Sequence, residues 1–178
     1  MIQHSMVSPR SRDTSLLVLI FFVAFALPSH AYIHNVEGFV QKVFDGDTVT
    51  LITRDGSKRR VRLYGIDAPE VRHGRKPGQA FGEDAKRALA GKVLRKVVTL
   101  TIQDIDRYKR VVGIIRIDNR NINEEMVRNG WAWAYREYLR GPYASEFIDA
   151  EREARGKKLG LWRKFNPQPP WEYRRGIR

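Results

Sequence analysis

The sequence has 178 residues, of which 42% are hydrophobic, and a formal net charge of +13 at pH 7. This length suits one domain, and the apolar content excludes a chain that is disordered throughout. The absence of cysteine excludes a lipoprotein anchor and a disulfide framework. The positive charge favours a polyanionic partner (nucleic acid, anionic lipid or acidic polysaccharide), although a basic surface also serves solubility alone.

Residues 1–31 have the pattern of a signal peptide. Arg10 and Arg12 precede an apolar run at 16–27, and the small residues of "SHA" follow at 29–31. As a helix this run spans about 18 Å, which is short of the roughly 30 Å of bilayer hydrocarbon. We therefore expect an exported protein, secreted or periplasmic. The alternative is an uncleaved segment that anchors the protein to the membrane.

Five segments rich in β-branched or alternating apolar residues are predicted to be strands. They span residues 36–44, 48–53, 58–66, 96–106 and 109–119. The first three form a meander, and the last two are separated by a short turn.

The Asp-Gly dipeptide at 55–56 predicts a two-residue turn between the second and third strands, because these residues suit the positive φ angles of a tight hairpin. With that turn Asp47 faces Tyr64, and on a flat ladder Asp67 lies about 10 Å beyond its partner. A curved barrel strand with a kink at Gly65 would fold this overshoot back over Asp47. The two carboxylates are therefore expected to converge at one end of the hairpin.

Three helices are expected, over residues 82–94, 122–130 and 145–160. Gly130 ends the second helix, and Ser145 is the predicted N-cap of the third, which carries acidic residues early and basic residues late. The tail at 166–178 is proline-rich and basic, and we expect it to be extended.

The order of these elements is that of an OB-fold: a meander of three strands, a helix, and a final pair of strands. The sequence therefore predicts an α+β, mainly β protein with a five-stranded OB-fold barrel and about three helices, over residues 32–165. A mixed α+β sandwich is the alternative architecture.

Asp47 and Asp67 are candidate ligands of a hard cation. The motifs "DGD" and "DAPE", each taken alone, are typical of an ordinary turn or loop. Their expected convergence through one hairpin indicates Ca²⁺ or Mg²⁺, which take oxygen ligands, whereas zinc favours His or Cys. Pro69 restricts Ala68 to an extended backbone, which can aim the Ala68 carbonyl outward as a further ligand.

Arg62 and Glu70 lie close to these aspartates in the sequence. Arg62 alternates with two apolar residues on the third strand, and an arginine can offer two parallel donors to a phosphate. Without its neighbours it would be read as a solvated surface arginine. A cation, arginines and a carboxylate that positions or deprotonates water together suit attack on a phosphodiester, and Glu70 is placed for the last role.

Four stretches of the chain resemble the staphylococcal nuclease (thermonuclease) family in order and spacing. They are "DGDTVTL", "VRLYGIDAPE", "DRYKRVVGII" and "NEEMVRNGWAWAY". The resemblance covers about residues 36 to 163 and implies an OB barrel with three helices. It also implies Ca²⁺-dependent hydrolysis of DNA and RNA at the P–O5′ bond, with little sequence specificity and 3′-phosphate ends.

The resemblance implies a role for each matched site residue. Asp47, Asp67 and the carbonyl of Ala68 would bind Ca²⁺. Glu70 would act as general base or orient the attacking water, and the residues themselves do not decide between the two.

The same resemblance implies that Arg62 and Arg110 are the two catalytic arginines. Arg110 by itself is a turn-flanking base between two strands. Contacts with the substrate are implied for four further residues, with a register ambiguous by one residue for the last two: Arg107, Tyr108, Tyr135 and Tyr138. For the neighbouring Trp131 and Trp133, core packing and base stacking are both open.

Two rival functions remain at this stage. One is a catalytically weak OB-fold module that binds nucleic acid. The other is a basic envelope protein that binds acidic polymers and whose acidic residues are structural. For the nuclease we expect DNA and RNA as substrates, no obligate protein partner, and a monomer.

Overall fold

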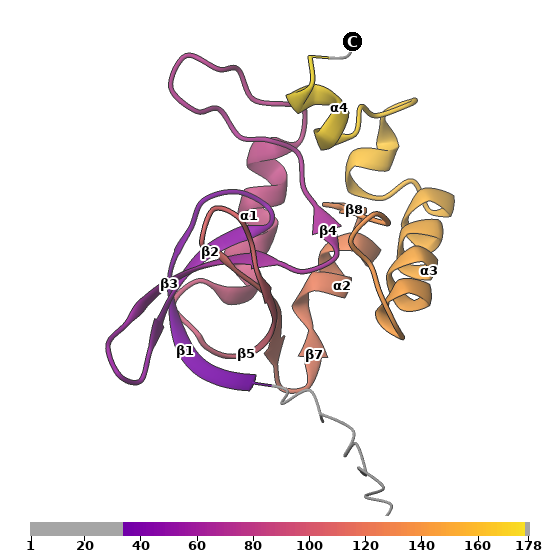
Figure 1. Cartoon of the computed structure of the whole chain (residues 1–178). Coiled ribbons are helices and arrows are strands. Elements are labelled where there is room, and N and C mark those ends of the chain that lie inside the picture. The colour runs from indigo at the N-terminus through magenta and orange to yellow at the C-terminus, as the bar shows by residue number, and fades with distance from the viewer. Residues whose placement is uncertain (1–33, 177–178) are drawn as a thin grey trace, which may run out of the picture. The chain divides into compact units, whose positions relative to one another are not determined.

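The computed structural model of the chain describes residues 34–176, and the predicted export segment at 1–31 lies outside these residues. Five strands form a closed barrel (Figure 1). They are β1 (His34–Val43), β2 (Thr48–Thr53), β3 (Lys58–Leu63), β5 (Val97–Ile105) and β6 (Val111–Ile117). Neighbouring strands are antiparallel in the order β3-β2-β1-β5-β6, and parallel pairing of β3 with β6 closes the barrel. The predicted OB-fold is confirmed, and the sandwich alternative is wrong.

Short strands connect the barrel to the helical side of the molecule. β4 (Ile66–Asp67) pairs antiparallel with β8 (Trp133–Ala134), and β7 (Arg120–Asn121) pairs with the end of β6. Gly65 has a φ of 73° and bends the chain between β3 and β4, at the predicted kink. A Cβ there would lie 2.5 Å from Leu139 Cδ2, so both the backbone angle and the packing require glycine.

The loop of the β2–β3 hairpin differs from the prediction: it has three residues instead of two. The N–H of Thr53 donates to the carbonyl of Ser57 at 3.0 Å, which closes the loop over residues 54–56. Within this loop Gly56 alone has a positive φ, of 81°. A two-residue type I′ turn needs positive φ at both central residues, so the backbone here satisfies a longer loop.

The longer loop shifts the hairpin register by one residue. Thr48 pairs with Arg62, and the carbonyl of Asp47 accepts the N–H of Leu63 at 2.8 Å, so the predicted pairing of Asp47 with Tyr64 is wrong. Directly paired residues of an antiparallel ladder point to the same face. The observed register therefore places the Arg62 side chain on the face of Thr48, next to Asp47.

The interior of the barrel is filled by alternate residues of its strands. Val49, Leu51, Val61 and Leu63 are each at most 1% exposed. Burial of each such side chain contributes about 1.5–3 kcal/mol to folding. The intervening Arg62 is outside the barrel, where it lines a pocket.

Three helices match the expected ones to within a few residues: α1 (Gly82–Val93), α2 (Ile122–Arg128) and α3 (Tyr143–Gly156). The predicted N-cap of α3 is wrong, because the helix begins before Ser145, whose hydroxyl instead donates to the carbonyl of Pro142 at 3.3 Å. A 3₁₀ turn, η1 (Gly160–Arg163), follows α3. Among residues 34–176, no helix is both long enough and apolar enough to cross a membrane.

The tail contains a fourth short helix, α4 (Pro170–Arg174), so the prediction of extended chain is wrong for these residues. Pro170 lies at the start of the helix, where its fixed φ is favourable and its missing N–H costs nothing. A helix of five residues is not stable in isolation. Contacts with the rest of the molecule must hold it, and one of them is the stacking of Trp171 on Tyr135.

Glu125 of α2 links three elements, and its replacement tests how much this link stabilises the fold. It accepts hydrogen bonds from Arg120 (2.6 and 2.9 Å) and from Lys92 of α1 (2.6 Å). The bond from Arg120, followed by that from Lys92, lowers the pKa of Glu125 to about 2. Because the pKa in the folded state lies below the unfolded value, the stabilisation is present above about pH 4.5 and is lost as the pH falls toward 2.

We therefore expect Glu125→Gln to lower the free energy of unfolding by about 1 kcal/mol near pH 7. The difference from wild type should shrink between about pH 4.5 and 2, as measured by urea unfolding at several pH values. The control is Glu137→Gln, because Glu137 is exposed and forms no ion pair among the described residues. A deficit that is independent of pH would contradict the prediction.

Candidate active site

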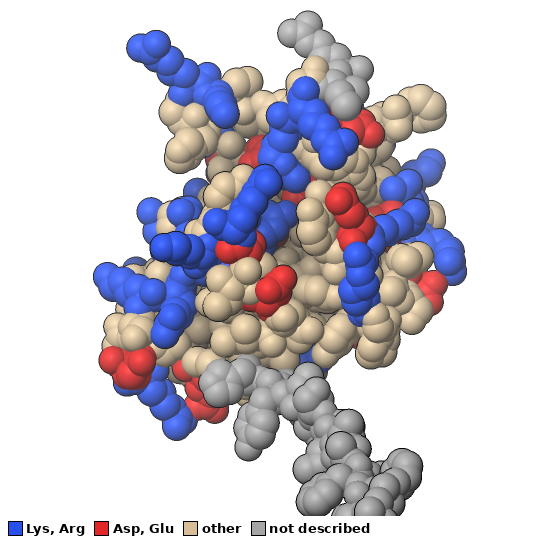
Figure 2. All heavy atoms as spheres, in the orientation of Figure 1, with Lys and Arg blue, Asp and Glu red and all other residues tan. Residues whose placement is uncertain are grey.

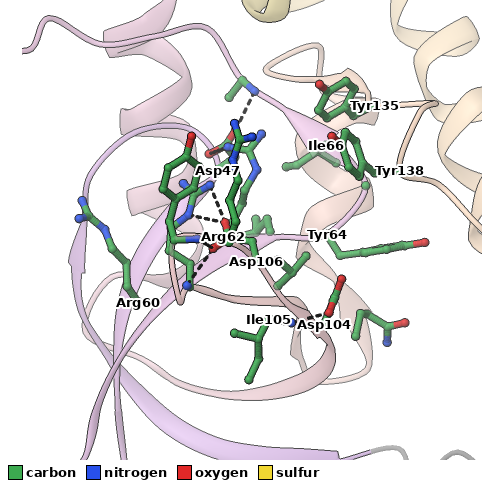
Figure 3. Close-up of a pocket in the computed structure, with 18 of the residues that line it drawn as sticks. Asp47, Arg60, Arg62, Tyr64, Ile66, Asp104, Ile105, Asp106, Tyr135 and Tyr138 are labelled. Atoms are coloured by element: carbon green, nitrogen blue, oxygen red, sulfur yellow. Dashed lines mark hydrogen bonds and ion pairs between the residues drawn. The ribbon is translucent and has the colours of Figure 1, made fainter.

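A pocket of about 1210 Å³ lies beside the barrel, between the end of β3 and the β5–β6 hairpin. Figure 3 shows Asp47 and Arg62 on one side of it and Tyr135 with Tyr138 on the other. All but one of the predicted site residues line this pocket. They are Asp47, Arg62, Ala68, Glu70, Arg107, Tyr108, Arg110, Tyr135 and Tyr138. The exception is Asp67, whose side chain is 0% exposed beneath two arginines.

The turn between β1 and β2 packs closely against the residues that follow β4 and places Asp47 beside them. A Cβ on Gly46 would lie 2.6 Å from the Cβ of Ala68 and 2.8 Å from that of Ala85, so only glycine permits this approach. The Asp47 carboxylate accepts the N–H of Ala68 (3.0 Å) and the hydroxyl of Thr48 (2.9 Å). The two acidic motifs of the sequence are thus joined directly.

Arg62 bridges the two aspartates from β3. Its Nη1 lies 3.4 Å from Oδ1 of Asp47, and its Nη2 donates to Oδ1 of Asp67 at 2.8 Å. Asp47 and Asp67 therefore converge on one guanidinium group, as the sequence predicted for the carboxylates. The convergence depends on the bend at Gly65 and on the observed register.

Burial and neighbouring charges give the acidic residues of this cluster different protonation behaviour. Burial favours protonation of Asp47, but the charge of Arg62 and the N–H of Ala68 hold its pKa below the ordinary value. Burial, followed by the charge of Asp47, raises the pKa of Asp45 to about 8. Burial also raises the pKa of Asp67, against the hydrogen bond from Arg174. Asp47 is therefore the ionised member of the Asp45–Asp47 pair near pH 7.

Glu70 is held at the pocket mouth through its main chain. Its N–H donates to the side chain of Gln79 (2.9 Å), and its carbonyl accepts the N–H of Gln79 (2.8 Å). A Cβ on Gly82, where α1 begins, would lie 2.3 Å from the Glu70 carbonyl oxygen, so α1 starts directly against this residue. The Glu70 carboxylate is free to face the pocket, where it accepts a hydrogen bond from Arg174 at 2.7 Å.

Arg110 lies on the β5–β6 hairpin, directly before Val111, which pairs with Val61 of β3. It donates to Asp106 through its side chain at 2.8 Å, and Asp106 also accepts the N–H groups of Tyr108 and Arg110 at 2.9 Å. Although partial burial opposes it, the hydrogen bonds from Arg110 lower the pKa of Asp106. Among the described residues Arg110 makes no ion pair with the acids around Arg62, so the structure places the two predicted catalytic arginines in one pocket without direct linkage through a carboxylate.

Two predicted residues, Tyr135 and Tyr138, form an aromatic wall of the pocket, and a tryptophan of the tail stacks on one of them. The rings of Tyr135 and Tyr138 lie 4.7 Å apart, and Tyr135 stacks on Trp171 at 5.3 Å with an interplanar angle of 1°. Trp133 behind them is 3% exposed and packs edge-on against Trp162, which confirms core packing for this tryptophan. Both tyrosines line the pocket.

Arg174 lines the pocket but is not among the residues predicted from the sequence. It lies 107 residues from Asp67 in a tail that was expected to be extended, yet it donates to both oxygens of the Asp67 carboxylate, at 3.1 and 2.8 Å. The available signal was weak: two prolines followed by an aromatic residue and a pair of arginines, which favours a short helix start. Nothing in that signal says where the helix docks.

The donor set suits a hard cation, if one is bound. Between residues 34 and 176 the structure contains no group of three or more His, Asp or Glu side chains arranged to hold a metal ion. The buried carboxylates of Asp47 and Asp67 nevertheless meet at the Arg62 guanidinium. They offer oxygen atoms as cation ligands, without sulfur or imidazole. Oxygen donors are the ligands that Ca²⁺ and Mg²⁺ prefer. The residues therefore fit such a cation in their chemistry, although they are now paired with arginines.

The sequence matches a known family from β3 to the end of η1. A sequence model of the family described as Staphylococcal nuclease homologue matches residues 60–164. The matched range contains every predicted site residue except Asp47, and it ends before α4.

Three similar proteins match a larger share of the chain than the family model does. Protein ParB of Escherichia coli is 42% identical over 150 residues, which are 79% of this chain and 80% of that protein. Micrococcal nuclease of Shigella flexneri is 40% identical over 150 residues, 79% of this chain and 82% of that protein. A Haemophilus influenzae protein named as an uncharacterized endonuclease is 40% identical over 136 residues, 76% of this chain and 71% of its own.

Proposed function

Because the chain belongs to the staphylococcal nuclease family, we propose that it is a nuclease that uses Ca²⁺ to hydrolyse phosphodiester bonds of DNA and RNA with little sequence specificity. The observation that carries this proposal is the bridge from Arg62 to Asp47 and Asp67. That bridge stands in a pocket that Glu70 and Arg110 also line. Arginines, carboxylates and room for a phosphate are the groups that phosphodiester hydrolysis needs.

The reaction assigns a different task to each group of the pocket. A cation held by Asp47, Asp67 and the Ala68 carbonyl would supply a Lewis acid for a phosphoryl oxygen and for a bound water. Glu70 accepts the proton of the attacking water or orients that water. Arg62 and Arg110 donate to the phosphoryl oxygens, and these bonds strengthen as negative charge builds up in the transition state.

Substrate binding without sequence specificity follows from the walls of the pocket. The rings of Tyr135 and Tyr138 can stack with any base, because every base has an aromatic face. Arg107 and Tyr108 extend the opposite wall and suit a terminal phosphate. Figure 2 shows that Lys and Arg side chains gather on the side of the molecule that carries β3, with few acidic side chains among them. Contacts between basic side chains and phosphates do not depend on the base sequence, and they weaken as the salt concentration rises.

The test is a plasmid-nicking assay with Ca²⁺, with EDTA, and with Ca²⁺ restored after EDTA. We expect nicking with Ca²⁺, loss of nicking in EDTA and recovery afterwards. Asp47→Ala should require a higher Ca²⁺ concentration, because it removes a buried oxygen donor. Cleavage that persists in EDTA would overturn the metal dependence. Binding of DNA without cleavage under any of these conditions would instead support the OB-fold binding module.

A further inference from the structure

The side chain of Arg174 is placed among the acidic groups of the pocket. Its Nη1 donates to Oε1 of Glu70 at 2.7 Å and to Oδ1 of Asp67 at 3.1 Å, and its Nη2 donates to Oδ2 of Asp67 at 2.8 Å. Both oxygens of Asp67 are therefore engaged, and Oδ1 is shared with Arg62. The Arg174 guanidinium is thus hydrogen-bonded both to Asp67, a proposed ligand of the cation, and to Glu70, the carboxylate proposed to activate water.

Several independent contacts dock α4, so the position of Arg174 is built into the fold. Trp171 stacks on Tyr135 and meets Trp133 edge-on at 6.3 Å. The hydroxyl of Tyr173 donates to the carbonyl of Pro77 at 2.6 Å. In Figure 1 α4 lies beside the loop that follows β4, which is the loop that carries Pro77. The anchors thus come from two separate segments, the loop after β4 and the chain around β8, and Arg174, the last residue of α4, lines the pocket.

The charges in contact within the pocket show what Arg174 contributes. Asp47, Asp67 and Glu70 face two guanidinium groups, those of Arg62 and Arg174, which leaves one net negative charge when all are ionised. A divalent cation would turn this into one net positive charge, which matches a single phosphodiester. Without Arg174 the same site with its cation would be neutral. Arg174 therefore adds one positive charge at the cation site itself, beside the other arginines that line the pocket, and this favours the binding of a phosphate.

Arg174 also occupies carboxylate oxygens that a cation would need as ligands. While the Arg174 guanidinium is hydrogen-bonded to both carboxylate oxygens of Asp67, a cation cannot bind these oxygens. The cation can bind them only after Arg174 has found another hydrogen-bond partner. A substrate phosphate offers such a partner, because phosphate accepts two parallel hydrogen bonds from arginine. The side chain is 39% exposed and lines the pocket, so it can turn from the carboxylates to a bound phosphate without unfolding.

We propose that Arg174 is a further substrate-binding residue, which exchanges the carboxylates of Asp67 and Glu70 for a substrate phosphate and so couples the binding of nucleic acid to the binding of the divalent cation. This inference rests on the proposed function of the pocket. In the absence of nucleic acid, Arg174 competes with the cation. In its presence, Arg174 holds the phosphate, and Asp67 and Glu70 are released for their proposed roles.

The experiment measures Ca²⁺ binding by titration calorimetry on the full chain, with and without a cleavage-resistant phosphorothioate oligodeoxynucleotide. Wild type is compared with Arg174→Gln and with the matched control Arg175→Gln, whose side chain is on the same helix end but makes no ion pair among the described residues. We expect Arg174→Gln to bind Ca²⁺ about tenfold more tightly than wild type when no oligonucleotide is present. Its affinity for the oligonucleotide should fall about tenfold, and the oligonucleotide should tighten Ca²⁺ binding less than in wild type.

A second variant tests the same coupling without touching the arginine. Trp171→Ala removes the stacking that docks α4, and it should shift both affinities in the same direction as Arg174→Gln. Unchanged or weaker Ca²⁺ binding in Arg174→Gln, or unchanged oligonucleotide binding, would overturn the inference. If wild type nicks plasmid with Ca²⁺ while Arg174→Gln behaves as wild type in every titration, the inference fails alone. If wild type binds no Ca²⁺ and nicks no DNA, the proposed function fails with it.

Discussion

Glu70→Gln is expected to lower the rate constant for phosphodiester cleavage by about 10²- to 10⁴-fold. The glutamine has the same shape, and the main chain of residue 70 is fixed by two hydrogen bonds with Gln79, so the variant should fold normally. It cannot accept a proton from water, which is the proposed task of Glu70. Initial rates of plasmid nicking at saturating substrate and Ca²⁺ measure the effect.

The matched control for this variant is Glu172→Gln. Glu172 is a partly buried carboxylate of the neighbouring α4 that makes no ion pair among the described residues. We expect its nicking rate to remain within about twofold of wild type, as for a substitution outside the reacting groups. If Glu70→Gln keeps a near-normal cleavage rate and unfolds normally on heating, Glu70 takes no part in the reaction. Its role is then only that of a hydrogen-bond partner of Arg174.

Arg62→Gln is expected to lower both the free energy of unfolding, by about 3 kcal/mol, and the rate constant of cleavage, by about 10²- to 10³-fold. The stability effect arises because Asp47 and Asp67 are buried and Arg62 bridges them. Removal of one partner of a buried ion pair leaves a charge that burial disfavours. The rate effect arises because the variant loses a guanidinium aimed at the phosphoryl oxygens.

The pH dependence of this variant separates the charge from simple loss of packing. In wild type the charge of Arg62 helps to hold the pKa of Asp47 below its ordinary value, so the folded protein favours ionised Asp47. Without Arg62, burial raises that pKa above the unfolded value, and stability is then lost as the pH rises through the unfolded pKa. The deficit should therefore be largest near pH 7 and smaller near pH 4, in urea unfolding against Arg59→Gln. Arg59 is an exposed residue of the same strand. An equal deficit at both pH values would contradict the charge argument.

Much of the barrel could be predicted from local patterns. The strand over Thr48–Thr53 was predicted with its observed bounds, because β-branched residues and alternation are strong where one face is buried. α1 was predicted to within one residue for a similar reason, since acids begin it and Lys92 lies in its last turn. The hairpin register was wrong by one residue. The Asp-Gly dipeptide is compatible with two loop lengths, and only the hydrogen bond between Thr53 and Ser57 selects one of them.

The candidate site was predictable where its members lie on one hairpin and its continuation. Asp47, Arg62 and Asp67 are separated by few residues, so strand geometry and a bend bring them together. Arg110 needed the family resemblance, since its local pattern is that of a turn. Arg174 was not predictable, because α4 is too short to be recognised by periodicity and is held by an aromatic stack with Tyr135, more than thirty residues away in the sequence.

The sequence by itself determined the kind of chemistry this protein can carry. It supplies hard oxygen donors without cysteine, arginines beside carboxylates, and a strand order that closes into an OB barrel. The tertiary structure decided which charges meet. The register of one hairpin brought Arg62 to Asp47, and the docking of a five-residue helix brought Arg174 to Asp67 and Glu70. Local propensities set the elements, whereas burial of side chains distant in sequence sets how those elements pack, and a site assembled by packing is visible only in the folded chain.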